Sequence, residues 1–493
     1  MIITLVESLW HWLVNAFFAV DAFCLMLSIK FKIIGTVFIL SYVISNFLLF
    51  LFSSVMIFRY YYKKKFSRLP TIDERLLPSV AILVPAYNES MVINDTLNHL
   101  VTLDYPNYNI VVINDGSSDE TMDVLHEEHQ LQPVSIETTT DLIHQPIKGV
   151  WRSRKDPRIV VIDKHNGRKS DALNAGLNIT SADYFVCIDA DSFVCPEVLK
   201  IAMAEVLTYK EVIGVGCSLR IMEGATKLPD GRMVAKIPAK PIYAFQSIEY
   251  IRAFVLARMG WTAVNAQPLI SGAFALYKKD IVVAAGGYRD NAIGDDSDMT
   301  LLVHEYMTTK RPEQKYRLSY IPEALCWTQV PADWMSLFNQ RIRWQRGSMN
   351  GIYHRFKFFL TFKHLGLSLG AIPFTIIFTH LASPLELLSA LTFIDLLLHH
   401  ALRWDTFTVS ILVAGAFWSC VTLYALLIDI LTARTYRSPW VSFSFFFLSF
   451  IQSYSYGLFL AVASCIGFYR ECMRWKPSHG SMKRVKISSV SDI

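Results

Sequence analysis

The sequence predicts an α/β domain with a largely parallel sheet, inserted between α-helical membrane segments. Apolar runs without charge stand near both ends of the 493-residue chain, and short β-rich runs alternate with helical stretches between them. The composition agrees, because 53% of the residues are hydrophobic and only 18% are charged, with a mean hydropathy of +0.32. This balance is typical of a water-soluble domain flanked by membrane helices.

The first predicted element is a transmembrane hairpin in residues 1–62. Residues 33–58 contain no charge and exceed the roughly 20 apolar residues that span a bilayer, whereas residues 9–29 form a weaker run that carries Asp21. The RYYYKKK stretch that follows places both ends of the hairpin in the cytoplasm. Asp21 either has a function within the membrane or reaches water near a helix end. Residues 63–78 are the expected linker.

Residues 79–350 are predicted to form the α/β domain. Four β-rich runs, VAILVPAY, NIVVIND, RIVVIDK and YFVCIDAD, end in polar or acidic residues and are separated by helical stretches. This alternation predicts parallel strands, and parallel sheets bind ligands at the carboxyl ends of their strands. The functional site is therefore expected at that edge.

The C-terminal part is predicted to begin with an amphipathic helix on the membrane surface, residues 351–364, followed by transmembrane helices in residues 365–470. The apolar runs cover residues 366–398, 408–432 and 441–468. The first run is too long for one untilted span, so it forms either a tight hairpin at Ser383-Pro384 or one long tilted helix. The choice decides on which side of the membrane the basic tail, residues 471–493, lies.

The charge pattern disfavours nucleic acid as a partner, and the cysteines disfavour a zinc site and a disulfide framework. The net charge of +5 does not indicate nucleic-acid binding, because the basic residues cluster beside the apolar runs, as in membrane proteins with positive cytoplasmic flanks. The eight cysteines include no CxxC pair, so neither a zinc site nor a disulfide framework is expected. The lipid bilayer is the predicted partner, and nucleic acid is not.

Two carboxylates follow the apolar run FVCI, Asp189 and Asp191, with one residue between them. Such a pair can bind Mg²⁺ or Mn²⁺, which prefer oxygen ligands and bridge the oxygens of a diphosphate. Taken alone, an acidic pair at a strand end is more often a solvated turn, so a metal site is favoured only together with other signals.

Further polar residues are expected at the same edge. The first run delivers Pro85, Tyr87 and Glu89 at its carboxyl end, and the second delivers Asp115. Tyr87 can stack on a base, although the DGSSDET segment also has the pattern of an ordinary helix N-cap. Lys169 follows an Asn-Gly turn near the start of a helix, where a phosphate is favoured, and a solvated basic loop is the alternative.

Three more carboxylates, Asp295, Asp296 and Asp298, crowd together just before a helical stretch. Their mutual repulsion raises the pKa of at least one of them, which suits a general base. The alternative is that these acids only cap the helix.

The QRIRW segment carries the last candidate residues. On a helix, Gln340, Arg343 and Trp344 share one face. A guanidinium there can hold a diphosphate with two hydrogen bonds, while an indole offers its face to a sugar ring. A membrane-proximal basic helix with an interfacial tryptophan is the alternative.

The segments PAYNE, DGSSDET, NGRKSDALN, DAD, SGAF, GDD and QRIRW occur in this order within residues 79–347. In this order they resemble the membrane-integrated members of glycosyltransferase family 2, which include the cellulose, chitin, hyaluronan and poly-N-acetylglucosamine synthases. The resemblance implies a GT-A domain, a Rossmann-like nucleotide-binding fold, in the cytosol between transmembrane helices.

The resemblance also implies a role for each matching residue. Tyr87 and Asp115 correspond to uridine contacts, with Pro85, Glu89 and Lys169 nearby. The two aspartates of DAD correspond to the pair that binds the donor diphosphate through Mg²⁺ or Mn²⁺.

On the acceptor side, Asp296, preceded by Asp295, corresponds to the base that deprotonates the acceptor hydroxyl. Gln340, Arg343 and Trp344 correspond to the motif that closes over the diphosphate and braces the acceptor. The predicted catalytic residues are therefore Asp296, Arg343 and the second aspartate of DAD.

Departures from the family pattern bear on the identity of the transferred sugar. GDD replaces the TED of cellulose and poly-N-acetylglucosamine synthases and is similar to hyaluronan synthases, but Ser297 follows where those enzymes usually have arginine. No cyclic-dinucleotide domain follows the last helix, which disfavours a cellulose synthase, and FYRECMRWKPSHG resembles the end of poly-N-acetylglucosamine synthases.

The resulting prediction is an inverting, metal-dependent hexosyltransferase. It would move a sugar from a UDP-sugar, UDP-GlcNAc being favoured, to a growing β-linked glycan, coupled to export. It would be a multi-pass protein of the plasma or inner membrane with a cytoplasmic catalytic domain, and a small membrane accessory subunit is a further candidate partner. Polar residues in the apolar runs, among them His380, Asp429 and Gln452, either line an export path or pair between helices. The alternatives are a non-processive transferase acting on a lipid acceptor and an inactive binding or export subunit.

Overall fold

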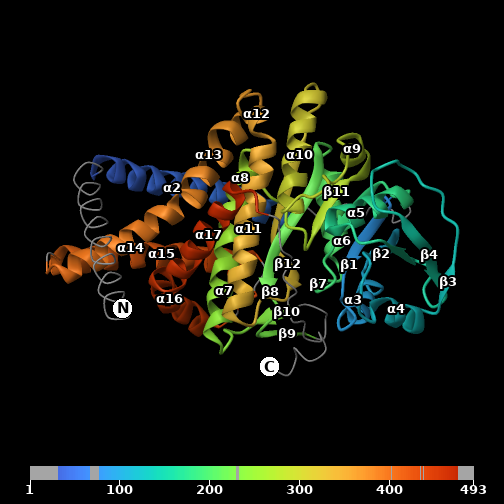
Figure 1. Ribbon diagram of the computed structural model, residues 1–493, viewed down its shortest axis with the longest axis horizontal. Helices are drawn as coiled ribbons and strands as arrows, with labels where there is room; N and C mark the ends of the chain where they lie inside the picture. Colours follow the sequence, from blue (N-terminus) through green and yellow to red (C-terminus); the bar gives the residue numbers. More distant parts are fainter. Residues whose placement is uncertain are drawn as a thin grey trace, which may run out of the picture.

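The computed structural model describes residues 32–66, 77–228, 233–400, 402–432, 435–436 and 438–475. A ten-stranded mixed sheet lies on one side of the described part and the long apolar helices lie on the other, with α11 (Trp334–His354) between them (Figure 1). This arrangement agrees with the predicted α/β domain inserted between apolar helices.

The sheet has the strand order β3-β4-β5-β2-β1-β6-β11-β8-β12-β7. Its strands are β1 (Val80–Ala86), β2 (Tyr108–Asn114), β3 (Leu131–Pro133), β4 (Ile147–Ser153), β5 (Ile159–Lys164), β6 (Tyr184–Cys187), β7 (Ser192–Val194), β8 (Val212–Ile221), β11 (Ala275–Lys278) and β12 (Arg317–Thr328). A separate hairpin pairs β9 (Ala225–Lys227) with β10 (Met233–Ala235). The four predicted β-rich runs are β1, β2, β5 and β6, and they are parallel neighbours, so their carboxyl ends meet at one edge.

The apolar runs are continuous because the sheet is covered on both faces. In β1, Ile82 and Val84 pack into one core, while Ala81 and Leu83 pack into the other. The covering helices are α3 (Ile93–Leu100), α4 (Thr121–His129) and α6 (Val198–Thr208) on the first face, and α5 (Arg168–Ile179), α9 (Lys279–Ala284) and α10 (Asp295–Lys310) on the second. Each helix thereby fixes the position of a loop at the edge of the sheet.

The remaining helices are α2 (Lys32–Phe66), α7 (Pro241–Ile251), η2 (Arg252–Ala257), α8 (Arg258–Ala263), α12 (Phe356–Phe359), η3 (Gly366–Ala371), α13 (Ile372–Thr375), η4 (Ile376–His380), α14 (Ala382–Leu398), α15 (Trp404–Thr432), α16 (Pro439–Tyr454) and α17 (Tyr456–Cys472). Within the described residues, three stretches are long and apolar enough to cross a membrane: Val37–Tyr62, Gly366–Leu398 and Phe407–Thr432. The pair α16 and α17 meets the same criterion together, bent by 45°, which makes four if the pair is one span.

The C-terminal part settles one alternative and differs from the expectation at one place. Of the two forms left open for the first apolar run, the structure has the long helix, because Gly366–Leu398 is one continuous helical stretch with π-helical segments and the chain does not turn back at Ser383-Pro384. Residues 351–364 are not one helix, because α11 continues to His354 and only the four-residue α12 follows. The run with Asp21, most of the linker and most of the basic tail lie outside the described residues.

The domain and the apolar helices share one core. Ile57 of α2, Ile251 of α7, Trp327 of β12, Leu426 of α15 and Phe445 of α16 are buried in the same cluster. The sheet is therefore packed directly against helices of membrane-spanning length, which places the edge of the domain beside the predicted lipid surface.

Polar residues of the apolar helices pair with the domain. Asp429 of α15 forms an ion pair with Arg220 of β8 at 2.6 Å, and the two side chains are 0% and 1% exposed. Gln345 of α11 donates to His380 Nδ1 at 2.8 Å, and Gln452 of α16 donates to a backbone carbonyl of α7. The sequence left open whether such residues line an export path or form pairs, and these three residues form pairs.

Candidate active site at the carboxyl edge of the sheet

The loops after β1 and β2 are joined by a side chain in the left-handed region. Asn88 has φ 57°, and its Oδ1 accepts hydrogen bonds from the backbone N–H groups of Ser118 at 2.8 Å and Asp119 at 3.3 Å. In return, the Asn88 N–H donates to Ser117 Oγ at 3.0 Å. The two loops thus form one rigid wall of the site.

The predicted base-stacking residue lies on that wall. Tyr87 directly follows β1 and is 52% exposed, so its ring is accessible for stacking. Pro85 lies within β1 opposite Ile113 of β2, and Glu89 is buried. Among these three residues, only Tyr87 presents most of a side chain to solvent.

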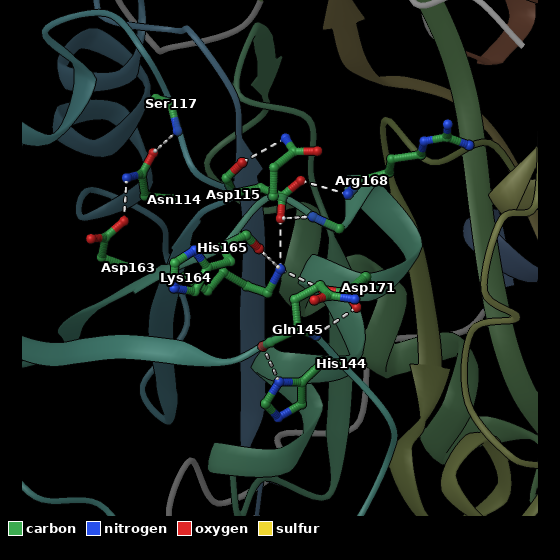
Figure 2. Close-up of polar contacts among 12 residues, drawn as sticks. Asn114, Asp115, Ser117, His144, Gln145, Asp163, Lys164, His165, Arg168 and Asp171 are labelled. Carbon is green, nitrogen blue, oxygen red and sulfur yellow. Dashed lines mark hydrogen bonds and ion pairs between the residues drawn. The ribbon is translucent and has the colours of Figure 1, made fainter.

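Asp115 anchors the loop that precedes α5 (Figure 2). Its Oδ1 accepts the Gly167 N–H at 3.0 Å, and its Oδ2 accepts the Arg168 N–H at 2.7 Å. Lys164, at the end of β5, is 0% exposed and pairs with Asp115 at 2.7 Å and also with Asp171. The Asp115 carboxylate therefore shapes the NGRK loop and places Lys169 at the second position of α5.

Four of the predicted site residues converge around the Lys169 ammonium. Its Nζ lies 2.5 Å from Asp189 Oδ1 and 3.6 Å from Asp295 Oδ2. The neighbouring Asp296 accepts the Gly272 N–H at 3.3 Å, and a Cβ added at Gly272 would stand 2.8 Å from Lys169 Nζ. The β6 loop, the start of α5, the SGAF segment and the start of α10 therefore meet at one point.

The charges in this cluster shift two pKa values in a functionally relevant direction. Burial and the adjacent Asp295 carboxylate raise the pKa of Asp296, and Lys169 and two backbone N–H groups offset this only in part. Burial lowers the pKa of Lys169, but the carboxylates of Asp189 and Asp295 outweigh burial and hold it well above its ordinary value. Lys169 is therefore a fixed cation, whereas Asp296 is a carboxylate that readily accepts a proton.

The DAD pair fits a divalent ion that takes its other ligands from a substrate. Asp191 is buried, whereas Asp189 is partly open to solvent beside Lys169. No group of three or more candidate metal-ligating side chains occurs within the described residues. Mg²⁺ is commonly held by only one or two carboxylates together with phosphates and water, and Mn²⁺ accepts similar oxygen ligands, so this donor set fits either ion.

Helix α11 packs against the GDD segment at backbone distance. Asp333 caps the helix, accepting the Ser336 N–H at 2.8 Å. A Cβ added at Gly294, the residue before Asp295, would stand 2.9 Å from the Cα of Gly347 in α11. Only glycine permits this approach, which ties the helix of the QRIRW segment to the loop of the predicted base.

The predicted residues of α11 differ in their surroundings. Trp344 is 42% exposed, and the guanidinium of Arg341 lies 4.0 Å from its ring centroid. Arg341 also hydrogen-bonds to Gln340. Arg343 is exposed and forms no ion pair with the acidic residues of the described part.

Comparison with known proteins decides the family. The model described as "Glycosyl transferase family 2" matches residues 81–282, and that of "Glycosyl transferase family group 2" matches residues 184–462, which is more than half of the chain. The chain belongs to glycosyl transferase family group 2. The GT-A fold expected from the family resemblance is confirmed with it, since the mixed sheet and the flanking membrane-length helices are those of this architecture.

Relatives of this family 2 chain include two synthases. The chain is 28% identical over 314 residues to the poly-beta-1,6-N-acetyl-D-glucosamine synthase of Staphylococcus epidermidis, covering 62% of this chain and 65% of the relative. It is 30% identical over 289 residues to the synthase of the same name from Staphylococcus aureus (strain COL), covering 59% and 58%. The chain thus spans less than two thirds of either relative.

Among solved structures, a mannosyltransferase of Pyrobaculum calidifontis, in complex with GDP-mannose and Mn²⁺, is 15% identical to the family 2 chain. The alignment covers 87% of this chain and 99% of that one, with a TM-score of 0.46.

Motif matching missed several residues of this family 2 site. Burial raises the pKa of Glu223, which follows β8, to about 7, with a smaller contribution from Asp191; within the described residues its Oε2 is buried without a hydrogen-bond partner. Glu223 follows an apolar strand as Asp189 does, and this signal could have identified it. Lys164 and Gly347 gave no comparable signal. A lysine at a strand end usually faces solvent, and a glycine within a helix does not by itself indicate a close contact.

Proposed function

We propose that this protein is an inverting glycosyltransferase that moves N-acetylglucosamine from UDP-GlcNAc to the end of a growing β-linked polysaccharide. The observation that carries the proposal is the convergence of Lys169, Asp189, Asp295 and Asp296 at the edge where the parallel strands end. A diphosphate needs cationic partners there, and an acceptor hydroxyl needs a base.

On the donor side, Tyr87 offers a ring for the uracil base, and Lys169, the fixed cation beside Asp189, would face the diphosphate. Asp189 and Asp191 would hold Mg²⁺ or Mn²⁺, which would neutralise the charge of the departing UDP. Lys169 faces Asp189 and Asp295, and Asp296 lies beside them, so adding a diphosphate without a further cation would leave the site strongly negative. This imbalance supports metal dependence.

On the acceptor side, Asp296 takes the proton of the attacking hydroxyl onto its carboxylate. The acceptor oxygen forms a bond to the anomeric carbon while the bond from that carbon to the diphosphate oxygen breaks, and UDP leaves with the electron pair. Attack opposite the leaving group inverts an α-linked donor to a β-linked product. The raised pKa of Asp296 supports this role, because a general base works best with a pKa nearer the working pH.

The choice of sugar and product rests on the relatives. Two curated relatives are named poly-beta-1,6-N-acetyl-D-glucosamine synthases, and the sheet shares a core with helices of membrane-spanning length. A polymer made at this site would emerge beside those helices, which supports export coupled to synthesis from a cytoplasmic domain.

The proposal is tested by offering a panel of UDP-sugars to the purified full chain with Mg²⁺, with Mn²⁺ or with EDTA. We expect metal-dependent UDP release with UDP-GlcNAc and a long product that a β-N-acetylglucosaminidase degrades. A single labelled glycolipid in place of polymer would establish the lipid-acceptor alternative. If none of the UDP-sugars gives UDP release, the proposal is refuted and the inactive-subunit alternative is favoured.

A further inference from the structure

The indole of Trp344 is held by a charged stack. Arg341 lies one helical turn before it on α11, is buried, and covers one face of the ring at 4.0 Å from the ring centroid. Behind the guanidinium, Glu249 of α7 accepts from Arg341 at 2.7 Å. The order carboxylate, guanidinium, indole leaves the other side of Trp344 toward solvent.

The same carboxylate reaches the bent pair of apolar helices. The hydroxyl of Tyr456 donates to Glu249 Oε2 at 2.7 Å, and Tyr456 is 2% exposed. Tyr456 is the first residue of α17, next to Ser455 where the chain bends by 45°. Glu249 therefore connects the helix break with the stack on Trp344.

Close packing between α11 and α17 reinforces this connection. A Cβ added at Gly467 of α17 would stand 3.0 Å from the Ile342 carbonyl oxygen in α11. The ring of Trp334, at the start of α11, lies 6.3 Å from that of Tyr456 and 5.2 Å from that of Phe459. The helix break is therefore joined by direct packing to the helix that carries Trp344.

We propose that Glu249 and Arg341 are positioning residues, which hold the Trp344 indole as a platform for the terminal sugar of the acceptor glycan and link it through Tyr456 to the break between α16 and α17. This inference rests on the proposed function. A sugar ring stacks its C–H face on an indole, and this contact requires a fixed orientation of the indole. A half-exposed tryptophan without the stack would sample several rotamers.

Loss of Glu249 or Arg341 should weaken acceptor binding and leave donor binding nearly unchanged. Loss of a desolvated cation–π contact and its ion pair weakens acceptor binding by about tenfold. Neither Glu249 nor Arg341 contacts the cluster of Lys169 and Asp189 in the described structure, so the KM for UDP-GlcNAc should stay within about twofold. Weaker retention of the acceptor end also gives shorter polymer.

The test uses the full chain in detergent, with a β-linked N-acetylglucosamine oligosaccharide as acceptor. Glu249→Gln and Arg341→Met should raise the Kd for the oligosaccharide, measured by calorimetry, and its KM by about tenfold, and shorten the polymer. Arg341→Lys keeps the charge without the planar stack and should lie between these variants and the wild type. Tyr456→Phe removes only the hydroxyl and should shift product length in the same direction by less.

Glu471→Gln is the matched control, because Glu471 accepts from Arg346 of the same helix at 3.0 Å, away from Trp344. It should lower the unfolding temperature without changing the oligosaccharide Kd or the product length. Wild-type oligosaccharide affinity and product length in both Glu249→Gln and Arg341→Met would overturn the inference, and unchanged product length in Tyr456→Phe would overturn the link to the helix break. A wild type that releases no UDP refutes the proposed function instead.

Discussion

A single methyl group at Gly347 tests whether the contact between α11 and the GDD segment sets the geometry of the site. A Cβ at Gly347 would stand 2.9 Å from the Cα of Gly294 and 3.0 Å from its N. Contacting carbon atoms lie about 3.5 to 4.0 Å apart, so the two segments must separate by roughly 0.6 Å or more. Both partners are backbone, so no flexible side chain can absorb the change.

Two consequences follow for Gly347→Ala. Overpacking costs about 1 to 3 kcal/mol, of which the gain in helix propensity returns about 1, so the net loss of stability is about 0 to 2 kcal/mol. Catalysis is more sensitive, because a misplacement of about 1 Å at a reacting centre can lower the rate by about 10²-fold. The predicted separation approaches that size, and we expect kcat for UDP release to fall by about tenfold or more.

Gly351→Ala is the matched control on the same helix, one turn further along. Its added Cβ would meet its nearest neighbours at 3.7 Å, an ordinary van der Waals distance. This variant should keep wild-type kcat and unfold at an equal or higher temperature. If Gly347→Ala turns over like the wild type, the contact does not set the geometry of the base, and the reasoning is refuted.

Three further predictions concern charged groups. Asp296→Asn should lower kcat by about 10² to 10⁴-fold. The kcat/KM of the wild type should rise with pH through the raised pKa of Asp296, because the base ionises there. A similar rise of kcat/KM in the variant would contradict the assignment of Asp296 as the base. Because burial disfavours ionised Asp296 in the folded state, the neutral variant should not unfold at a lower temperature at pH 7. Asp191→Asn should abolish the metal dependence of UDP-GlcNAc binding in calorimetry, and metal-independent binding by the wild type would exclude that role. Lys164→Met leaves two buried carboxylates without their cation and should lower the free energy of unfolding by about 3 to 5 kcal/mol, measured by thermal unfolding. Lys148→Met, which removes a half-exposed ion pair, should lower it by under about 1 kcal/mol. Equal losses of stability in the two variants would contradict the buried pairing of Lys164.

The part of the fold that followed from the sequence is the part with a local signal. The apolar runs of β1, β2, β5 and β6 are buried on both faces, so their composition alone marks them as parallel strands, and the acids after them fall at the same edge. The ion pair of Arg220 with Asp429 had no such signal, because an aspartate in an apolar run equally suits a pore lining. The close approach of Gly294 and Gly347 depends on how α11 crosses α10, which no local pattern encodes.

The structural contacts of Asp115 limit how it can make the predicted uridine contact. Its carboxylate has about four lone-pair sites. Lys164 and the Gly167 N–H occupy Oδ1, while the Arg168 N–H occupies one site of Oδ2 (Figure 2). One acceptor site on Oδ2 is left. It can accept one hydrogen bond from the N–H of a uracil ring, but it cannot accept a second donor in addition. The predicted uridine contact therefore requires that site, and the base can reach it only if the NGRK loop keeps the shape that the carboxylate itself imposes. We therefore expect donor recognition and the placement of Lys169 beside Asp189 to depend on the same side chain.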